Sequence, residues 1–161
     1  MKNSTINIHF TEFSSADELE IKYKHLIEKA KDAAQRAYAP YSSFFVGAAV
    51  MLANGEIVEG NNQENAAYPS GLCAERVALF YANSLYPNTS VQAIAICAFS
   101  NGKLTSEPVP PCGSCRQVLV ESETRFNTPI NIFLAGQNKI IKIESASELL
   151  PFNFNKEMLL K

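Results

Sequence analysis

The chain has no run of lysine or arginine and no long hydrophobic segment. It carries 14 Lys and Arg against 16 Asp and Glu over 161 residues, a formal net charge of −2. Nucleic-acid-binding surfaces are built from clustered basic residues, so this balance argues against a polynucleotide partner and favours a small, nearly neutral ligand. The longest apolar stretch, residues 44–53, is too short for a bilayer, which needs about 20 residues. The N-terminal MKNSTINIHF lacks the apolar core of a signal peptide, so we expect a cytosolic protein with no membrane association.

Histidine is scarce, and this limits the kinds of metal site that the chain can build. His9 and His25 lie far upstream of the other candidate ligands and have no partner at ligand spacing, so we interpret them as surface or core residues. The four cysteines are a better source of ligands. In a reducing compartment, metal binding or catalysis explains them better than disulfides do.

No internal repeat or low-complexity linker divides the chain, and its length suits one domain. Hydrophobic periodicity and turn residues predict helices alternating with strands, which favours an α/β fold with helices on both faces of a sheet. The predicted strands are residues 5–13, 44–53, 56–60, 91–99, 130–135 and 139–144, and Asn54-Gly55 forms a hairpin turn between the second and third of them. The first predicted helix starts at a Ser15–Glu18 capping box and runs to Ala37. The other predicted helices are residues 72–84, a helix that starts near residue 111, and a short helix at 145–150.

Three cysteines occur at the predicted starts of two helices. Cys73 stands in SGLCAERVALF, and Cys112 and Cys115 form a C-x-x-C pair in PPCGSCRQVLV. The unpaired N–H groups of a helix N-terminus favour the thiolate, which is the form that binds zinc. We therefore expect these three residues to be zinc ligands.

The fourth cysteine decides what kind of zinc site this is. Cys97 lies inside the apolar run AIAICAF, where a small core residue is expected, so we exclude it as a ligand. A structural zinc site has four protein ligands, whereas three ligands and an open position are typical of catalytic zinc. The ligand count therefore favours a catalytic centre.

Glu75 and two arginines follow the ligands closely. Glu75 cannot share a helix face with Cys73, and we expect it to act as a general acid and base beside the metal. The alternative is a glutamate that only stabilises the helix N-terminus. Arg76 and Arg116 each occur within the first turn after a ligand, where they could donate hydrogen bonds to the sulfurs; otherwise they are surface residues.

The two motifs together resemble those of the cytidine deaminases of the short, homotetrameric, three-cysteine type. The matching elements are CAE at Cys73–Glu75 and PCGSC at Pro111–Cys115, and further stretches, APYSSFFVGAAV, GNNQENAAY and ELLPFNF, also agree. The resemblance covers about residues 20–154. It implies a three-layer α/β/α sandwich with a mixed five-stranded sheet, an N-terminal extension at residues 1–16 and a single domain at residues 17–161.

The same resemblance implies an activity and a set of site residues. The activity is zinc-dependent hydrolytic deamination of cytidine and deoxycytidine, with one zinc ion per subunit and Glu75 as the catalytic group. The resemblance also implies a homotetramer with shared active sites and a small-molecule nucleoside substrate. The implied substrate-binding residues are Phe44 against the base, Asn62 and Glu64 on the ribose, and Ala66, Tyr68 and Phe154, which reach a neighbouring subunit's pocket.

Other interpretations of these residues stay open. The aromatic residues could be core or interface residues, and Asn62 and Glu64 could be turn formers. A related blasticidin-type aminonucleoside deaminase would have the same zinc motif, a structural zinc-binding module would need a fourth ligand, and a redox dithiol would not need Cys73 or Glu75. Two residues depart from the family pattern: Pro110 before the PCG element, and Ser122, where an aromatic residue is frequent.

Overall fold

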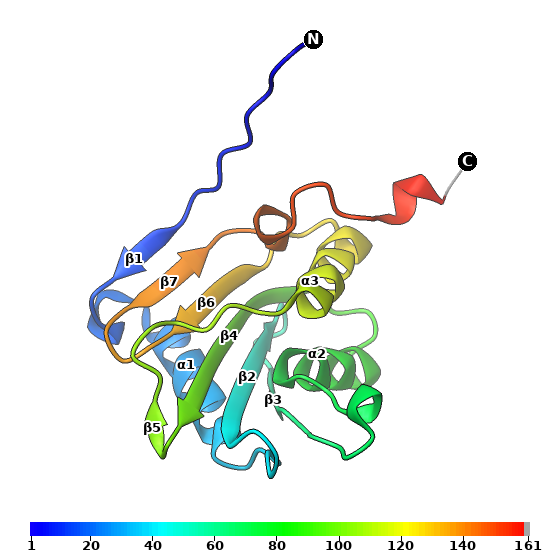
Figure 1. The fold of residues 1–161 in the computed structure, drawn as a ribbon. Coiled ribbons are helices and arrows are strands. Elements are labelled where there is room, and N and C mark those ends of the chain that lie inside the picture. Colours follow the sequence, from blue (N-terminus) through cyan, green and yellow to red (C-terminus); the bar gives the residue numbers. More distant parts are fainter. Residues whose placement is uncertain (160–161) are drawn as a thin grey trace.

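The computed structural model describes residues 1–159 and contains a mixed sheet at its centre (Figure 1). The strands lie in the order β1-β7-β6-β4-β2-β3, and β5 pairs only with β4. Their bounds are β1 Thr11–Phe13, β2 Phe44–Leu52, β3 Ile57–Asn61, β4 Val91–Ser100, β5 Lys103–Leu104, β6 Asn131–Ala135 and β7 Ile140–Ile143. Strands β4 and β6 are parallel and the other pairs are antiparallel. The family resemblance implied a five-stranded sheet, and these five strands correspond to β2, β3, β4, β6 and β7. The short strands β1 and β5 bring the sheet to seven strands.

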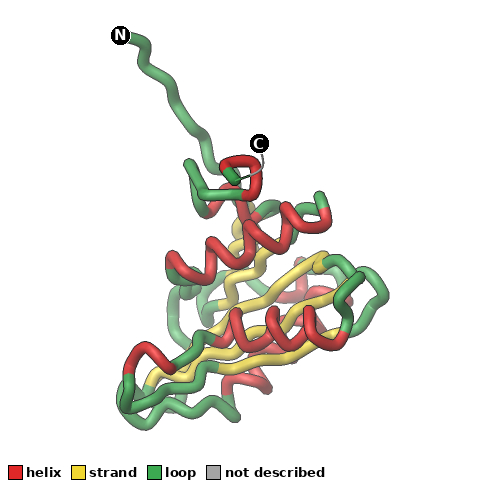
Figure 2. Tube along the Cα trace, turned by 90° about the vertical axis from the view of Figure 1, so that its right-hand side faces the viewer, coloured by secondary structure: helices red, strands yellow, loops and turns green. Residues whose placement is uncertain are grey.

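Helices cover both faces of the sheet, as predicted (Figure 2). Helix α1 (Ile21–Ala34) packs on one face, in a cluster that includes β2, β4 and β6 side chains. Helices α2 (Ala74–Leu85) and α3 (Gly113–Phe126) pack on the other face, in a second cluster. Alternate residues of β4 point into the two clusters, so this central strand is buried on both faces and reads as a continuous apolar run.

Two glycines let the helices approach the sheet closely. A Cβ at Gly47 of β2 would collide with the backbone of α1 at Ala30 and Ala34. A Cβ at Gly60 of β3 would collide with the backbone of α2 at Ala74 and Ala78. Each helix can therefore lie this close to the sheet only because the residue below it is glycine, which has no side chain.

The N-terminal part differs from the prediction. The Ser15–Glu18 capping box forms, but it caps a separate 3-10 helix, η1 (Ala16–Glu18), and α1 begins later, at Ile21. The predicted strand at 5–13 is reduced to β1, whose three residues pair with residues 140–142 of β7. Residues 1–10 form no regular structure and extend away from the sheet (Figure 1).

Short 3-10 helices complete the structure: η2 (Tyr68–Ser70), η3 (Ala146–Leu149) and η4 (Lys156–Met158). The predicted helix at 145–150 is thus a single 3-10 turn. Among the residues described, no helix is both long enough and apolar enough to cross a membrane.

Candidate metal centre and active site

The three predicted ligands meet where α2 and α3 begin. Cys73 is the N-cap of α2, Cys112 is the N-cap of α3, and Cys115 lies in the first turn of α3. All three sulfur atoms lie within 4.8 Å of one another; Cys73 Sγ and Cys112 Sγ are 3.9 Å apart, and Cys112 Sγ and Cys115 Sγ are 3.5 Å apart. Tetrahedral zinc at about 2.3 Å from each sulfur requires sulfur–sulfur distances of about 3.8 Å. The sulfur positions therefore fit a zinc ion.

The surroundings of the sulfurs favour charge on Cys73. The Arg76 guanidinium donates a hydrogen bond to Cys73 Sγ at 3.8 Å. The neighbouring Cys115 thiol, together with Arg76, lowers the pKa of Cys73 to about 5. The same interaction with Cys73, together with burial, raises the pKa of Cys115. One thiolate is thus available near neutral pH, and zinc binding displaces the remaining protons.

A fourth cysteine ligand is excluded by the fold. Cys97 is fully buried in β4, and it packs in the cluster on the α1 face, whereas the three ligands lie on the α2 and α3 side. Burial raises the pKa of its thiol to about 12, so it stays protonated. In residues 1–159 the one cluster of metal-ligating side chains consists of Cys73, Cys112 and Cys115, and both histidines are outside it. The prediction that Cys97 is a core residue is confirmed.

A cavity of about 970 Å³ opens beside the metal centre, between the start of α2, the start of β2 and the end of β3. Glu75 lies in its wall and is only 6% exposed. Burial raises the pKa of the Glu75 carboxyl, and the nearby Cys73 contributes in the same direction. A carboxyl group that holds a proton more readily than usual, next to a metal centre, can act as a general acid and base.

The structure brings most of the other predicted residues into the same cavity wall. These are Phe44, Asn62, Glu64, Ala66 and Tyr68, together with Cys73, Arg76 and Cys112. They come from the start of β2, from the loop between β3 and α2, and from the first turns of the two helices.

Asn62 and Glu64 are held in place by the start of β2. The Asn62 side chain accepts a hydrogen bond from the Val46 N–H at 2.8 Å and donates one to the Phe44 carbonyl at 2.9 Å. Glu64 accepts hydrogen bonds from the Ser42 hydroxyl and from the Tyr41 N–H, the latter at 2.8 Å. These bonds, that of Ser42 above all, lower the pKa of the Glu64 carboxyl, so it is a carboxylate at neutral pH.

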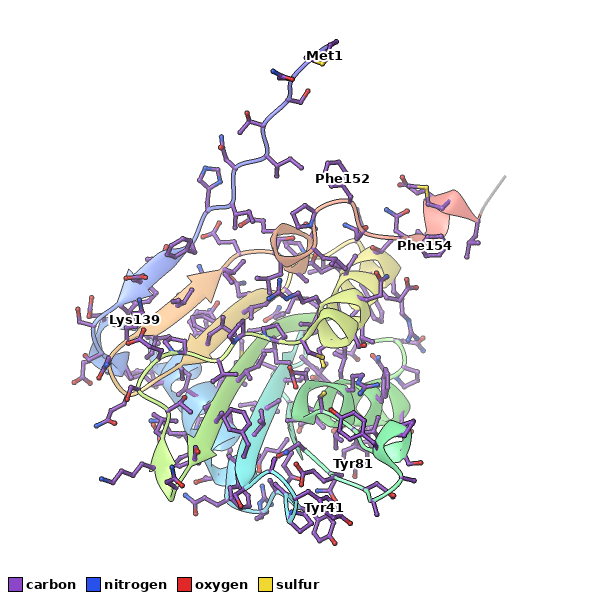
Figure 3. The ribbon with its side chains drawn as sticks, in the orientation of Figure 1. Met1, Tyr41, Tyr81, Lys139, Phe152 and Phe154 are labelled. Carbon is purple, nitrogen blue, oxygen red and sulfur yellow. The ribbon has the colours of Figure 1, made fainter. Side chains whose placement is uncertain are left out.

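Two predicted residues lie outside the cavity. Phe154 is 58% exposed in the C-terminal segment (Figure 3) and is not among the residues that line the cavity of this chain. Arg116 makes no bond to sulfur within the described residues. Its Nε donates to the Pro111 carbonyl at 2.9 Å and its Nη1 to the Leu149 carbonyl at 3.0 Å, because the C-terminal segment offers it an acceptor. The expected Arg116–sulfur contact was therefore wrong.

Several residues of the cavity wall were not among the predicted site residues. Tyr41 and Ser42 occur in APYSSFFVGAAV, and their positions between Pro40 and a buried strand could have pointed to a loop at the pocket. Val46 and Ile96 also line the cavity, but nothing in an apolar strand distinguishes such residues from the core. Of the two departures from the family pattern, Pro110 lines the cavity, and Ser122 is buried in α3, where its hydroxyl has no partner in the described part of the chain.

Fold and site together define a zinc-binding α/β enzyme in which a buried carboxyl group stands beside a three-cysteine metal centre. The zinc-binding region of cytidine and deoxycytidylate deaminases matches residues 20–127. The chain therefore belongs to the cytidine deaminase family, and its three-cysteine cluster binds zinc as in that family.

Individual relatives agree with this assignment. The chain is 42% identical to a cytidine deaminase of Halalkalibacterium halodurans over 82% of this chain and 93% of that protein. It is 41% identical to a cytidine deaminase of Sporosarcina psychrophila over 83% and 92%. The crystal structure of cytidine deaminase from Burkholderia pseudomallei is similar, with a TM-score of 0.68, 39% identity, and coverage of 81% of this chain and 97% of that one.

Proposed function

We propose that this protein catalyses the hydrolytic deamination of cytidine and deoxycytidine to uridine and deoxyuridine, with release of ammonia. The observation that carries the proposal is the position of Glu75, which is buried in the cavity wall two residues after the ligand Cys73. When bound, zinc supplies a Lewis acid that lowers the pKa of a coordinated water molecule.

Glu75 moves the protons of the reaction. Its carboxylate takes one proton from the attacking water and gives it to N3 of the cytosine ring as the water oxygen adds at C4. It then takes the proton of the new C4 hydroxyl and delivers it to the amino group as the C4–N bond breaks. Water is consumed and ammonia leaves, so the group returns to its starting state. The raised pKa of Glu75 suits a group that must both accept and donate a proton near neutral pH.

The cavity wall suits a nucleoside better than a nucleotide. In the wall described here the one cationic side chain is Arg76, which is directed at Cys73, whereas Glu64 is a carboxylate and would repel a phosphate group. The Phe44 ring can pack against the base, and Asn62 and Glu64 can accept hydrogen bonds from ribose hydroxyls. Asn62 and Glu64 are already fixed by backbone contacts, so little conformational entropy is lost when substrate binds.

The Glu75→Gln variant tests the assignment. It should keep the fold and one zinc ion per chain, but lose about 10²–10⁴-fold in kcat because an amide cannot shuttle protons. The measurement is the ultraviolet absorbance change of cytidine and of deoxycytidine with zinc-assayed protein. Near-normal turnover by this variant would refute the role of Glu75, and turnover of an aminonucleoside antibiotic but not of cytidine would point to the blasticidin-type activity.

We also infer that the active form is a homotetramer with shared sites. Apolar and aromatic side chains are exposed on α2 and on the loop before it: Tyr68 at 91%, Phe80 at 47%, Tyr81 at 55% and Leu85 at 49%. The cavity volume is near the upper end of the range of about 300–1,000 Å³ for small-molecule sites, which leaves room for side chains of another subunit. Phe154, which lies outside its own chain's cavity, is a candidate for such a contribution.

A reducing compartment such as the cytosol would keep the ligand thiols free.

A charge on the exposed face of α2 tests this assembly. Tyr81, which lies on α2 (Figure 3), is outside the cavity wall. Tyr81→Glu should yield smaller species in size-exclusion chromatography with light scattering, and these should have lost most of the deaminase activity. A monomeric variant with full activity would contradict the shared-site assembly.

A further inference from the structure

The Arg116 guanidinium joins two parts of the backbone that are far apart in the sequence. Nε donates to the carbonyl of Pro111, the residue directly before the zinc ligand Cys112. Nη1 donates to the carbonyl of Leu149, the last residue of η3. One planar side chain therefore links the loop that carries a ligand to the C-terminal segment, here defined as residues 145–154.

The C-terminal segment is also fastened to α3 at its beginning. The Glu123 carboxylate accepts hydrogen bonds from the N–H of Ala146 at 2.7 Å and of Ser147 at 3.1 Å, and from the Ser145 hydroxyl at 3.0 Å. Arg116 and Glu123 are seven residues apart, which places them on the same side of α3. Helix η3 is thus held at both ends, and the end nearer the metal is held by Arg116.

The three ligands differ in how firmly packing holds them. Cys115 is fully buried, and Cys73 is half-buried with a bond from Arg76. Cys112 is exposed, so few packing contacts fix its side chain, whereas the preceding Pro111 is buried. The position of the Cys112 sulfur therefore depends on the backbone at Pro111, which is where Arg116 binds.

We propose that Arg116 is a positioning residue that braces the Pro111–Cys112 backbone against the C-terminal segment, so that retention of the metal depends on residues 145–154. The inference rests on the zinc site of the proposed function and not on the identity of the substrate. Groups around a metal's ligands commonly change metal affinity by about 10–100-fold when they are removed. We expect an effect of this size on zinc release.

The experiment measures zinc transfer from the purified holoprotein to a chromogenic chelator, 4-(2-pyridylazo)resorcinol, without substrate. Arg116→Gln should release zinc about tenfold faster or more, because glutamine cannot span the two carbonyls. Arg116→Lys keeps the charge but lacks the planar fork of donors, so its rate should lie between those of Arg116→Gln and the unmodified protein. If Arg116→Gln does not fold, the lysine variant alone decides the test.

Arg125→Gln is the matched control. Arg125 lies on the same helix and also donates to a backbone carbonyl, that of Pro87, but it is ten residues from Cys115. Its removal should leave the rate of zinc release within about twofold of the original. Equal rates for Arg116→Gln, Arg116→Lys and the original protein would overturn the proposal, as would equal acceleration in Arg116→Gln and Arg125→Gln.

Glu123→Gln tests whether the brace runs through the C-terminal segment. This substitution weakens the attachment of η3 at its far end, so zinc release should again accelerate, and the double variant with Arg116→Gln should release zinc more slowly than the product of the two single effects predicts. A Glu123→Gln protein with lower thermal stability but unchanged zinc release would overturn the involvement of residues 145–154. Cytidine turnover is measured separately, so absence of deaminase activity would refute the proposed function without affecting this result.

Discussion

Single residues around Glu64 show how the substrate side of the cavity is arranged before any ligand binds. The Ser42 hydroxyl donates to the Glu64 carboxylate and accepts the Phe44 N–H at 3.1 Å. Ser42 therefore connects a candidate ribose-binding residue to the aromatic residue proposed to contact the base. The Ser42–Glu64 bond could not be predicted from the sequence, because a complete hairpin separates the two residues.

Removal of the Ser42 hydroxyl should change the titration of Glu64. The folded-state pKa of Glu64 is lowered, chiefly by Ser42, so this carboxylate stabilises the fold above its unfolded pKa and loses that contribution as the pH falls through the folded pKa. In Ser42→Ala the folded pKa should rise toward its ordinary value, and the window over which stability is lost should move to higher pH.

Carboxyl ¹³C NMR with labelled glutamate measures this shift directly, and the KM for cytidine should rise more than kcat falls. Ser43→Ala is the matched control, since the hydroxyl of Ser43 makes no hydrogen bond within residues 1–159. An unchanged Glu64 titration in Ser42→Ala would show that the hydroxyl does not set its pKa.

At the level of elements, the two glycines in the hairpin of β2 and β3 allow a paired test. Gly47→Ala and Gly60→Ala both insert a methyl group against helix backbone, so each should destabilise the fold by about 1–3 kcal/mol or more. Only Gly60 faces α2, which carries Glu75 and begins after Cys73.

Gly60→Ala should therefore accelerate zinc release and lower kcat beyond its effect on stability, whereas Gly47→Ala, which displaces α1, should change stability alone. Urea unfolding and zinc transfer to a chelator measure the two effects. Equal zinc release by both variants would contradict the link between α2 packing and the metal site.

The elements were predictable where a local signal and the long-range pairing agree. The starts of α2 and α3 follow from Cys73 and Cys112 at cap positions before apolar runs, and the hairpin at Asn54-Gly55 follows from its turn residues. The strand at 5–13 was predicted too long, because alternation alone does not show whether a partner strand exists. Strand β5 was missed although Asn101-Gly102, both with positive φ, is the same hairpin signal.

The residues of the site also differ in how well the sequence predicted them. The ligands and Glu75 are recognisable because their residue types are unusual at helix starts. The actual partners of Arg116 were not, since Leu149 is 33 residues away in the sequence and reaches α3 only through β6, β7 and η3. Contacts between side chain and distant backbone depend on the complete fold, and no local pattern encodes them.

For the whole molecule, zinc connects two helices whose ligands are 39 positions apart. A cross-link that closes a loop of this length stabilises a fold by about 4 kcal/mol in the loop-entropy model. Removal of zinc should therefore lower Tm by about 10 °C for a chain of this size, as measured by calorimetry on metal-free protein.

Return of one equivalent of zinc should restore the original Tm. Cys97→Ser serves as a control, because Cys97 lies on the opposite face of the sheet from the zinc ligands. This variant should still bind one zinc ion, and removal of that ion should lower its Tm by the same amount. A metal-free protein that melts at the original temperature would show that the ion does not stabilise the fold.

The spacing of the ligands also has a consequence during synthesis of the chain. Cys73 is made 39 residues before Cys112. At about 5–20 residues per second, the ribosome needs about 2–8 s to add them. During this interval Cys73 cannot complete its metal site, because neither of its two partner ligands has been translated.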